Sequence, residues 1–469
     1  MYQTFKKGIL VNFIARYTNI IINILTTAFL ARLLEPAEFG VVAVVTVFTT
    51  FFSLLTEMGI GPAIVQQQDL DERETAHLFI FTMGIGVVTS GVFWGLAPWV
   101  AAFYQDSVYI SITRILAVAV FFSTGAIVPM ALLNKRQKFA LVSKISIAAN
   151  SIVSIITVFL AFHGFSFYSI ALKSVAFSII VFFLTLFFSK LAVRFEFQKS
   201  SLKKVLRFSS YQFSFNLINY FSRNLDNILI GKFLGASSLG LYDKAYSLML
   251  YPVQNLTHVI TPIMHPILAK YQSDYQFIYD TYLRIVKILA LLGIPISVFC
   301  YFSAEEIIYI FYGEKWLGIV PTFRILAATI WIQVILSSSG TIFQAANRTD
   351  MLFYSGTLSA GIMVLAIALG VASKCLETLA MYLLIAFIIN FLQAYYILIN
   401  KVLKRSVVNL YISLLNPMLI GIIMSMILYV FQIEVENHYL SLFIKVVINL
   451  LVYAVLIRLT KEYVFFNRF

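Results

Sequence analysis

The sequence predicts an all-α polytopic membrane protein with about 14 transmembrane helices, and three observations lead to this fold class. Hydrophobic residues fill 61% of the 469 positions and charged residues only 12%. A water-soluble protein of this length could not cover so much apolar surface with so few charges. Apolar runs of about 20 residues, long enough to cross a hydrocarbon core, recur along the whole chain. The loops between them are too short to hold a soluble domain.

The apolar runs give the expected helices in chain order. Six form a first set, at residues 8–34, 41–65, 77–103, 110–133, 142–163 and 166–189. Six more form a second set, at residues 208–234, 241–264, 282–311, 318–343, 351–372 and 379–400. Two further runs follow, at residues 410–431 and 439–459. The first run exceeds the apolar part of a signal peptide, so we expect it in the mature protein.

The two sets of six look like copies of one unit. Shifted by 200 positions, "ARLLEPAEFGVVA" aligns with "GKFLGASSLGLYDKA", so that Gly40 matches Gly240 and Pro62 matches Pro262. "ALLNKRQKF" and "FQAANRTDM" both end a fourth helix, with Asn134 paired to Asn347. An even number of spans makes both copies enter the membrane from the same side. We therefore expect two pseudo-symmetric six-helix lobes, 1–200 and 201–405, and two additional transmembrane helices in 406–469.

The distribution of lysine and arginine sets the expected orientation. With both termini in the cytoplasm, most basic loop residues fall inside. The outer loops then hold only Arg32, Lys232, Lys315 and Lys374. This asymmetry is the positive-inside pattern of a multi-pass protein. It also explains the net charge of +13 without nucleic acid as a partner. The basic stretch "KLAVRFEFQKSSLKKVLR" is suited to anionic lipid headgroups as well as to topology.

A polar stripe runs through the first apolar helix. Asn12, Arg16, Asn19 and Asn23 are spaced by four, three and four residues, so they share one helix face. The shift of 200 positions brings polar residues onto all four, namely Gln212, Asn216, Asn219 and Arg223. A lipid-exposed arginine near the bilayer centre costs about 2.5–3.5 kcal/mol. We therefore expect the two stripes to line one aqueous cavity between the lobes.

Other polar residues lie close to this stripe in the predicted helices. The candidates for substrate binding are Asp226, Asn227, Asp243, Lys244 and Glu57. For Asp243, Lys244 and Glu57, an ion pair or hydrogen bond between helices is an equally good interpretation. Lys173 and Lys445 are expected to reach the membrane surface or to pair locally. Asp71 and Glu74 are expected to cap the third helix.

Several functional classes lack support in the sequence. No glycine-rich phosphate loop with a lysine is present, so ATP is not an expected driver, and no cofactor is expected. The five histidines and two cysteines lack the spacing of metal ligands, and no catalytic residues stand out. A basic cavity suits an anionic substrate, because arginine binds phosphate in a bidentate way. Asparagine side chains suit sugar hydroxyls. A substrate that combines a diphosphate, a glycan and a lipid tail is a polyprenyl-linked oligosaccharide.

Several segments resemble Wzx-type polysaccharide flippases of the multidrug/oligosaccharidyl-lipid/polysaccharide superfamily. "LARLLEPAEFGVVAVV" and "EMGIGPAIVQQQDLDERE" are similar to the opening helices of these proteins. "SRNLDNILIGKFLGASSLGLYDKAYSLMLYPVQNL" is similar to their seventh and eighth helices, and "ALLNKRQKF" to the end of their fourth. The resemblance covers about the first 350 residues well and the remainder by helix count. It implies a V-shaped fold of two lobes, with helices one, two, seven and eight lining the cavity.

The resemblance also implies a function, which is export rather than enzymatic catalysis. Such proteins move undecaprenyl-diphosphate-linked repeat units to the outer leaflet of a bacterial cell membrane, and Arg16 and Arg223 match basic positions of their cavities. Lys244 matches less well, because Asp243 beside it offsets its charge. A helix-one acidic residue of some cation-coupled relatives is absent, so H+ and Na+ stay open as coupling ions. Polysaccharide polymerases and assembly proteins are further candidate partners.

Three rival functions fit parts of the same pattern. A drug or metabolite exporter of the superfamily would handle cationic compounds, which a basic cavity does not suit. A lipid II flippase would make the gene essential for cell-wall growth. A non-transporting scaffold of an assembly complex would tolerate substitutions in the cavity.

Overall fold

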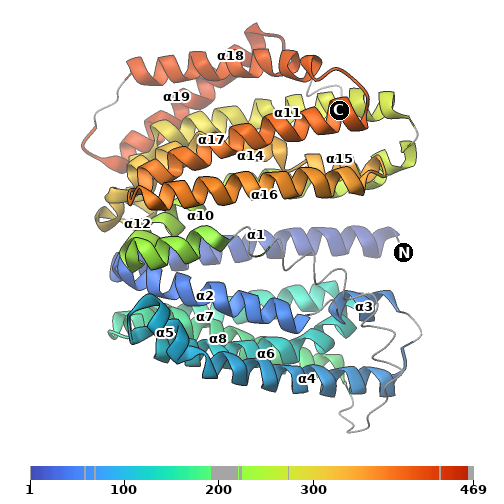
Figure 1. Ribbon diagram of the computed structural model, residues 1–469, viewed down its shortest axis with the longest axis vertical. Helices are drawn as coiled ribbons and strands as arrows, with labels where there is room; N and C mark the ends of the chain where they lie inside the picture. The colour runs from blue at the N-terminus through green and yellow to red at the C-terminus, as the bar shows by residue number, and fades with distance from the viewer. Residues whose placement is uncertain are drawn as a thin grey trace. The chain divides into compact units, whose positions relative to one another are not determined.

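Figure 1 shows the computed structural model of the chain, which describes residues 2–57, 60–67, 70–191, 220, 224–272, 274–431 and 435–462. The regular secondary structure in these ranges is helical throughout, which confirms the predicted all-helical membrane class. Eleven described helices are long and apolar enough to cross a membrane, or up to twelve when a bent pair counts as one span. The expected spans 208–234 and 241–264 overlap positions not described in full, so the count of fourteen stays a prediction.

The chain forms two compact units, residues 1–240 and 241–469. The helices of the N-terminal unit are α1 (Tyr2–Leu33), α2 (Pro36–Glu57), α3 (Ile60–Gln66), α4 (Glu72–Gly95), α5 (Ala97–Tyr104), α6 (Val108–Lys135), α7 (Phe139–Phe162) and α8 (Ser166–Ser189). Helix α10 (Gly235–Leu268) begins in this unit and continues in the next. The predicted lobe boundary at residue 200 lies outside the described ranges and stays a prediction.

The C-terminal unit contains the remaining helices. They are η1 (Ala269–Tyr271), α11 (Tyr275–Phe302), α12 (Ala304–Tyr312), η2 (Glu314–Ile319), α13 (Val320–Ala327), α14 (Ile330–Leu336), α15 (Ser339–Ala345), α16 (Thr349–Ala372), α17 (Leu376–Tyr395), the π-helix η3 (Tyr396–Val402), α18 (Val408–Val430) and α19 (His438–Leu459).

Helix packing in the N-terminal unit is centred on α6 and α8. Helix α8 lies against α6 and α7, α4 lies against α6, and α1 runs along α7 (Figure 1). The apolar core between them includes the fully buried Leu78, Val128 and Ala149. A Cβ atom on Gly125 would lie 2.7 Å from the ring of Phe182, so glycine permits the close approach of α6 and α8. Close packing of this kind stabilises helices in lipid, where apolar side chains gain little by leaving the solvent.

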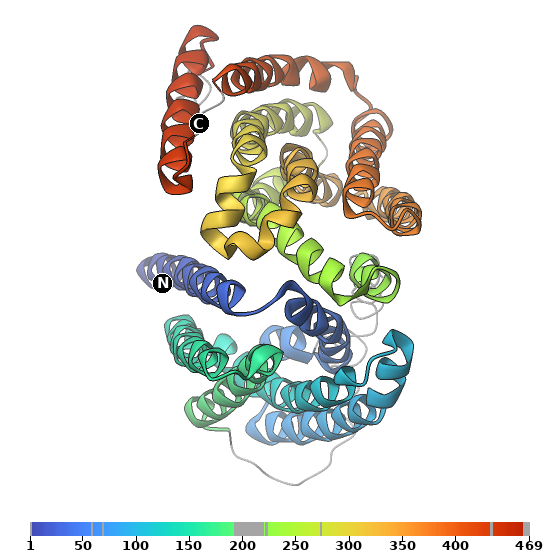
Figure 2. The same ribbon diagram turned by 90° about the vertical axis from the view of Figure 1, so that its left-hand side faces the viewer.

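The order of neighbours in the first unit recurs in the second. Helix α17 packs against α16 and against α13 and α14, and α11 packs against α13 and α14. In the first unit, α8 packs in the same way against α7 and α6, and α4 against α6. This is the arrangement that the proposed sequence repeat requires. The two additional helices follow, with α18 packed on α11 and α19 (Figure 2).

Three of the predicted runs are interrupted in the structure. The third breaks at Leu96, because Pro98 in the first turn of α5 has no N–H to continue the helix ladder. The ninth breaks at Ser303, between α11 and α12. The tenth bends by 46° between Glu314–Ala327 and Ile330–Ala345. A hydrophobic run therefore located these spans but did not reveal their breaks.

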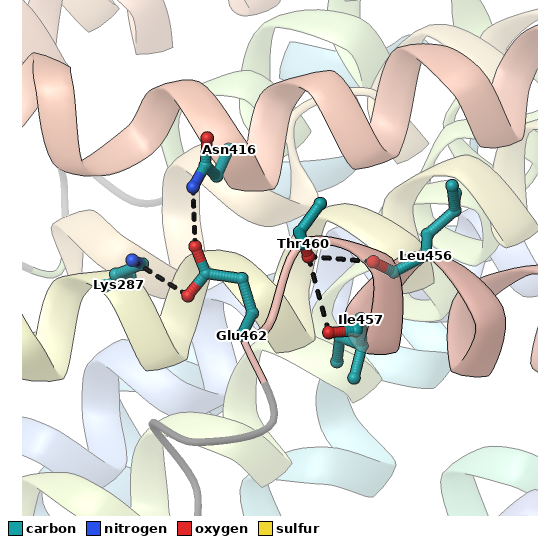
Figure 3. A network of polar contacts seen from close by, with 6 residues as sticks. All are labelled: Lys287, Asn416, Leu456, Ile457, Thr460 and Glu462. Carbon is teal, nitrogen blue, oxygen red and sulfur yellow. Dashed lines mark hydrogen bonds and ion pairs between the residues drawn. The ribbon is translucent and has the colours of Figure 1, made fainter.

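Two ion pairs with buried carboxylates hold α19 against its neighbours. Figure 3 shows that Glu462, just after α19, pairs with Lys287 of α11 at 2.8 Å and accepts a 2.7 Å hydrogen bond from Asn416 of α18. Within α19, Lys445 pairs with Glu306 of α12. The predicted local pairing of Lys445 is confirmed.

Helix α4 begins with the predicted cap. The Asp71 side chain accepts a hydrogen bond from the Glu74 backbone N–H at 2.5 Å, and the Glu74 side chain accepts one from the Asp71 N–H at 3.2 Å. This reciprocal pair satisfies two backbone donors that would otherwise lack partners at the start of the helix.

Candidate functional site

An open pocket of about 490 Å³, lined mainly by residues with polar side chains, lies in the N-terminal unit. Five helices line it, and four of them each supply two residues spaced by four, which places both on one helix face. The lining residues are Asn19 and Asn23 of α1, Thr49 and Ser53 of α2, Ala119 and Ser123 of α6, Ser146 and Asn150 of α7, and Lys173, Ser174, Phe177 and Ser178 of α8. Ten of these twelve side chains carry a hydrogen-bonding group, in helices that otherwise present apolar residues.

Hydrogen bonds across the pocket join α1 to α7. Asn150 donates to the amide oxygen of Asn19 at 2.9 Å, and Asn19 donates to the hydroxyl of Ser146 at 3.3 Å. Asn150 is 6% exposed, so its amide needs this partner to offset the loss of water. The bonds fix the orientation of the Asn19 amide at the wall of the pocket.

Lys173 supplies the positive charge of the pocket. Its ammonium donates to the amide oxygen of Asn23 at 3.3 Å, which links α8 to α1. In the described part of the chain, the residues that line the pocket include no acidic side chain. The pocket therefore combines one cation with a wall of amides and hydroxyls, which together can bind an anion or a polyhydroxylated ligand.

The structure brings two residues of the predicted stripe into this pocket, Asn19 and Asn23. Arg16 precedes Asn19 by three residues on the same helix face and is exposed. Glu57 is the last residue of α2 and is exposed. The side chain of Asn12 and the residues Asn216, Asn219 and Arg223 lie outside the described part of the chain. A shared cavity between the two stripes therefore stays a prediction.

The other predicted residues lie apart from the pocket. Asp226 is buried at 7% exposure and accepts a hydrogen bond from the backbone N–H of Asn227 at 2.8 Å. Asp243 and Lys244 form a 2.8 Å ion pair in α10, within the C-terminal unit. Their pairing agrees with the expectation that Asp243 offsets the charge of Lys244.

Comparison with known proteins identifies the family. The model of the polysaccharide biosynthesis protein family matches residues 29–321, more than half of the chain. The chain belongs to this family. It is 28% identical over 422 residues to the teichuronic acid biosynthesis protein TuaB of Bacillus subtilis (strain 168), covering 89% of this chain and 86% of that protein. It is 22% identical over 390 residues to the lipopolysaccharide biosynthesis protein WzxC of Escherichia coli (strain K12), covering 83% and 79%.

Solved structures show the same fold. The lipid II flippase MurJ in an inward closed conformation superposes with a TM-score of 0.75 at 14% identity, covering 97% of this chain and 99% of that one. The chain is therefore a multi-pass membrane protein of the polysaccharide biosynthesis family, and its fold is that of a known membrane transporter.

Sequence reasoning missed most of the pocket. The serines of α7 and α8 and Asn150 are spread over the chain and form no motif, although each pair shows a spacing of four. Lys173 stood out in an apolar run, but its position alone was equally consistent with a lysine that reaches the membrane surface.

Proposed function

We propose that this protein moves undecaprenyl-diphosphate-linked oligosaccharide repeat units from the inner to the outer leaflet of a bacterial membrane, for a cell-surface polysaccharide. The polar pocket inside a membrane-spanning unit of a polysaccharide biosynthesis protein carries the proposal. Amide and hydroxyl side chains within the membrane do not favour contact with an apolar lipid tail, but they form hydrogen bonds with sugar hydroxyls.

In this proposal two six-helix lobes, arranged in a V, alternate between inward-open and outward-open states. Arg16 and the nearby asparagines receive the diphosphate and the first sugars. Arg223 and the eighth transmembrane helix hold the glycan during the change of state, and the lipid tail stays in the bilayer. Both termini lie in the cytoplasm. The transport cycle is coupled to the movement of H+ or Na+, and polysaccharide assembly proteins are partners of the transporter.

The function is tested by deleting the gene and measuring lipid-linked glycans in the inner leaflet. We expect one undecaprenyl-linked oligosaccharide to accumulate and the matching surface polymer to be lost, with recovery when the gene is restored. Accumulation of lipid II instead would identify a cell-wall flippase. Unchanged polymer together with sensitivity to cationic compounds would identify a drug exporter.

The arginine roles are tested in a strain whose polymer depends on this gene. We expect Arg16→Ala and Arg223→Ala each to lower export about tenfold or more, because a charge-assisted hydrogen bond contributes about 1.5–3 kcal/mol. Arg114→Ala is the control, since this exposed arginine of α6 lies over the Trp94 ring, outside the pocket. Normal export by both variants at normal protein levels would remove these roles.

A further inference from the structure

Lys173 has no role in the diphosphate binding proposed above. It lies in α8, eighth from Ser166, so about 10 Å of helix separates it from the outer helix end at a rise of 1.5 Å per residue. A lysine at this depth usually directs its ammonium to the membrane surface. Here the ammonium instead donates to Asn23 and lines the pocket.

A structural tie between α8 and α1 does not require this lysine. Asparagine or serine at the same position could bond Asn23 without carrying a charge, whereas a lysine within a span costs about 2.5–3.5 kcal/mol on insertion scales. Among the residues that the structure describes, no acidic side chain lines the pocket to neutralise Lys173. Because intramembrane cations are expensive, an unneutralised one beside an open pocket indicates an anionic ligand.

The distance between the two cations of the N-terminal unit limits which anion each can bind. Lys173 bonds to Asn23, which lies seven residues beyond Arg16 on α1, so the two charged positions differ by about 10 Å along the helix axis. An anionic group that contacts Lys173 while the diphosphate stays at Arg16 must therefore lie about two turns further along α1. A glycan whose diphosphate lies at Arg16 extends along the polar stripe toward Lys173, and its second anionic group must then belong to a sugar.

We propose that the pocket is a separate subsite for an acidic sugar, in which the Lys173 ammonium binds the sugar carboxylate. Asn23 orients the ammonium through its amide oxygen, and Ser146, Ser174 and Ser178 are the hydroxyl groups that face the ring hydroxyls. The volume of about 490 Å³ lies in the range of ordinary small-ligand pockets. This inference rests on the proposed function, because it adds a preference for acidic glycans to a glycan transporter.

The test measures binding rather than transport, so it is independent of the deletion experiment. The full chain in lipid nanodiscs is titrated calorimetrically with cellobiouronic acid, with its carboxyl-reduced form cellobiose, and with inorganic diphosphate. We expect the wild-type protein to bind the acidic disaccharide about tenfold or more tightly than cellobiose, as a charge-assisted hydrogen bond requires. Lys173→Met and Lys173→Gln should remove this difference, and Lys173→Arg should keep most of it.

Two controls separate this subsite from the rest of the protein. Diphosphate affinity should be unchanged in both neutral Lys173 variants, and Arg114→Met should leave all three affinities unchanged. Lys173→Gln retains a polar side chain, so it reports on the charge if Lys173→Met does not fold, as judged by the thermal unfolding midpoint.

Three outcomes would overturn the proposal. The first is equal affinity of the wild-type protein for the two disaccharides. The second is a preference for the acidic disaccharide that persists in Lys173→Gln. The third is a loss of diphosphate affinity in Lys173→Gln, which would assign the pocket to phosphate binding. A confirmed preference in a protein whose deletion leaves lipid-linked glycans unchanged would keep the subsite and reject the flippase.

Discussion

The Asn19 amide of α1 donates a hydrogen bond to Ser146 of α7 and accepts one from Asn150. Asn150 lies one turn beyond Ser146 on α7. One amide of α1 is therefore bonded to two residues of α7, and this explains how a polar stripe persists in an apolar helix. The spacing of the stripe was readable in the sequence. Its partners were not, because α7 lies more than a hundred positions further along the chain.

Lys445 is the residue whose loss we expect to cost most stability. It pairs with Glu306, which also accepts a 2.7 Å hydrogen bond from Ser441. Lys445→Met leaves a buried carboxylate without its cation, and this should cost about 3–5 kcal/mol. The measurement is the thermal unfolding midpoint of the purified protein, which should fall by several degrees.

The double variant Lys445→Met/Glu306→Met is the matched control for this prediction. Replacing both members of a buried ion pair by apolar residues is often neutral. Unfolding should therefore return close to the wild-type midpoint. If the double variant is as unstable as Lys445→Met alone, the cost comes from packing and not from the unpaired charge.

The cap of α4 gives a smaller effect. Asp71→Ala removes the side-chain acceptor for the Glu74 backbone N–H, and caps of this kind contribute about 1 kcal/mol. We expect a small drop in the unfolding midpoint, and Asp71→Asn or Asp71→Ser should restore most of it because both can accept the same bond. An Asp71→Ala midpoint equal to that of the wild type would show that the cap contributes nothing measurable.

At the scale of helices, the first turns of α2 and α10 cross backbone against backbone. A Cβ atom on Gly40 would lie 1.7 Å from the carbonyl oxygen of Ala236, and one on Gly240 would lie 1.9 Å from that of Pro36. Each glycine thus faces the carbonyl four residues before the other. The two glycines are those that occupy matching positions when the sequence is shifted by 200.

The crossing predicts that neither glycine tolerates a methyl group. Gly40→Ala and Gly240→Ala should each cost about 1–3 kcal/mol, because a Cβ at either position overlaps backbone atoms that cannot rotate away. Gly84→Ala in α4 is the control, since nothing lies within 4 Å of its Cβ position. There alanine should be neutral or stabilising by up to about 1 kcal/mol. Comparable unfolding midpoints for all three variants would rule out the tight crossing.

The ends of the fourth helix of each set show where sequence alignment alone is too coarse. Gln137 and Asn347 both have positive φ, 55° and 54°, and the next residue in each case bonds back to Leu133 or Phe343. The turn geometry therefore pairs Gln137 with Asn347, whereas the sequence motif paired Asn134 with Asn347. Asn134 and Asn347 are the same residue type but occupy different positions of the turn.

For the whole molecule, the predicted orientation can be tested by labelling single cysteines in intact cells. In a Cys300→Ala/Cys375→Ala background, His163→Cys should react with a membrane-impermeant maleimide, because the α7–α8 loop is predicted to lie outside. Gln137→Cys in the α6–α7 loop should react only after the cells are opened. The reverse pattern would place both termini outside the cytoplasm.

The sequence by itself determined the class of protein, the approximate position of most spans and the polar face of α1. These follow from local rules, since bilayer thickness sets span length and helix periodicity sets which residues share a face. The tertiary structure decided where the spans break and that Asn19, Asn150 and Lys173 line one pocket. Helix packing brings such distant positions together, and the contacts that fix it depend on side-chain shape across the whole unit, which no single segment encodes.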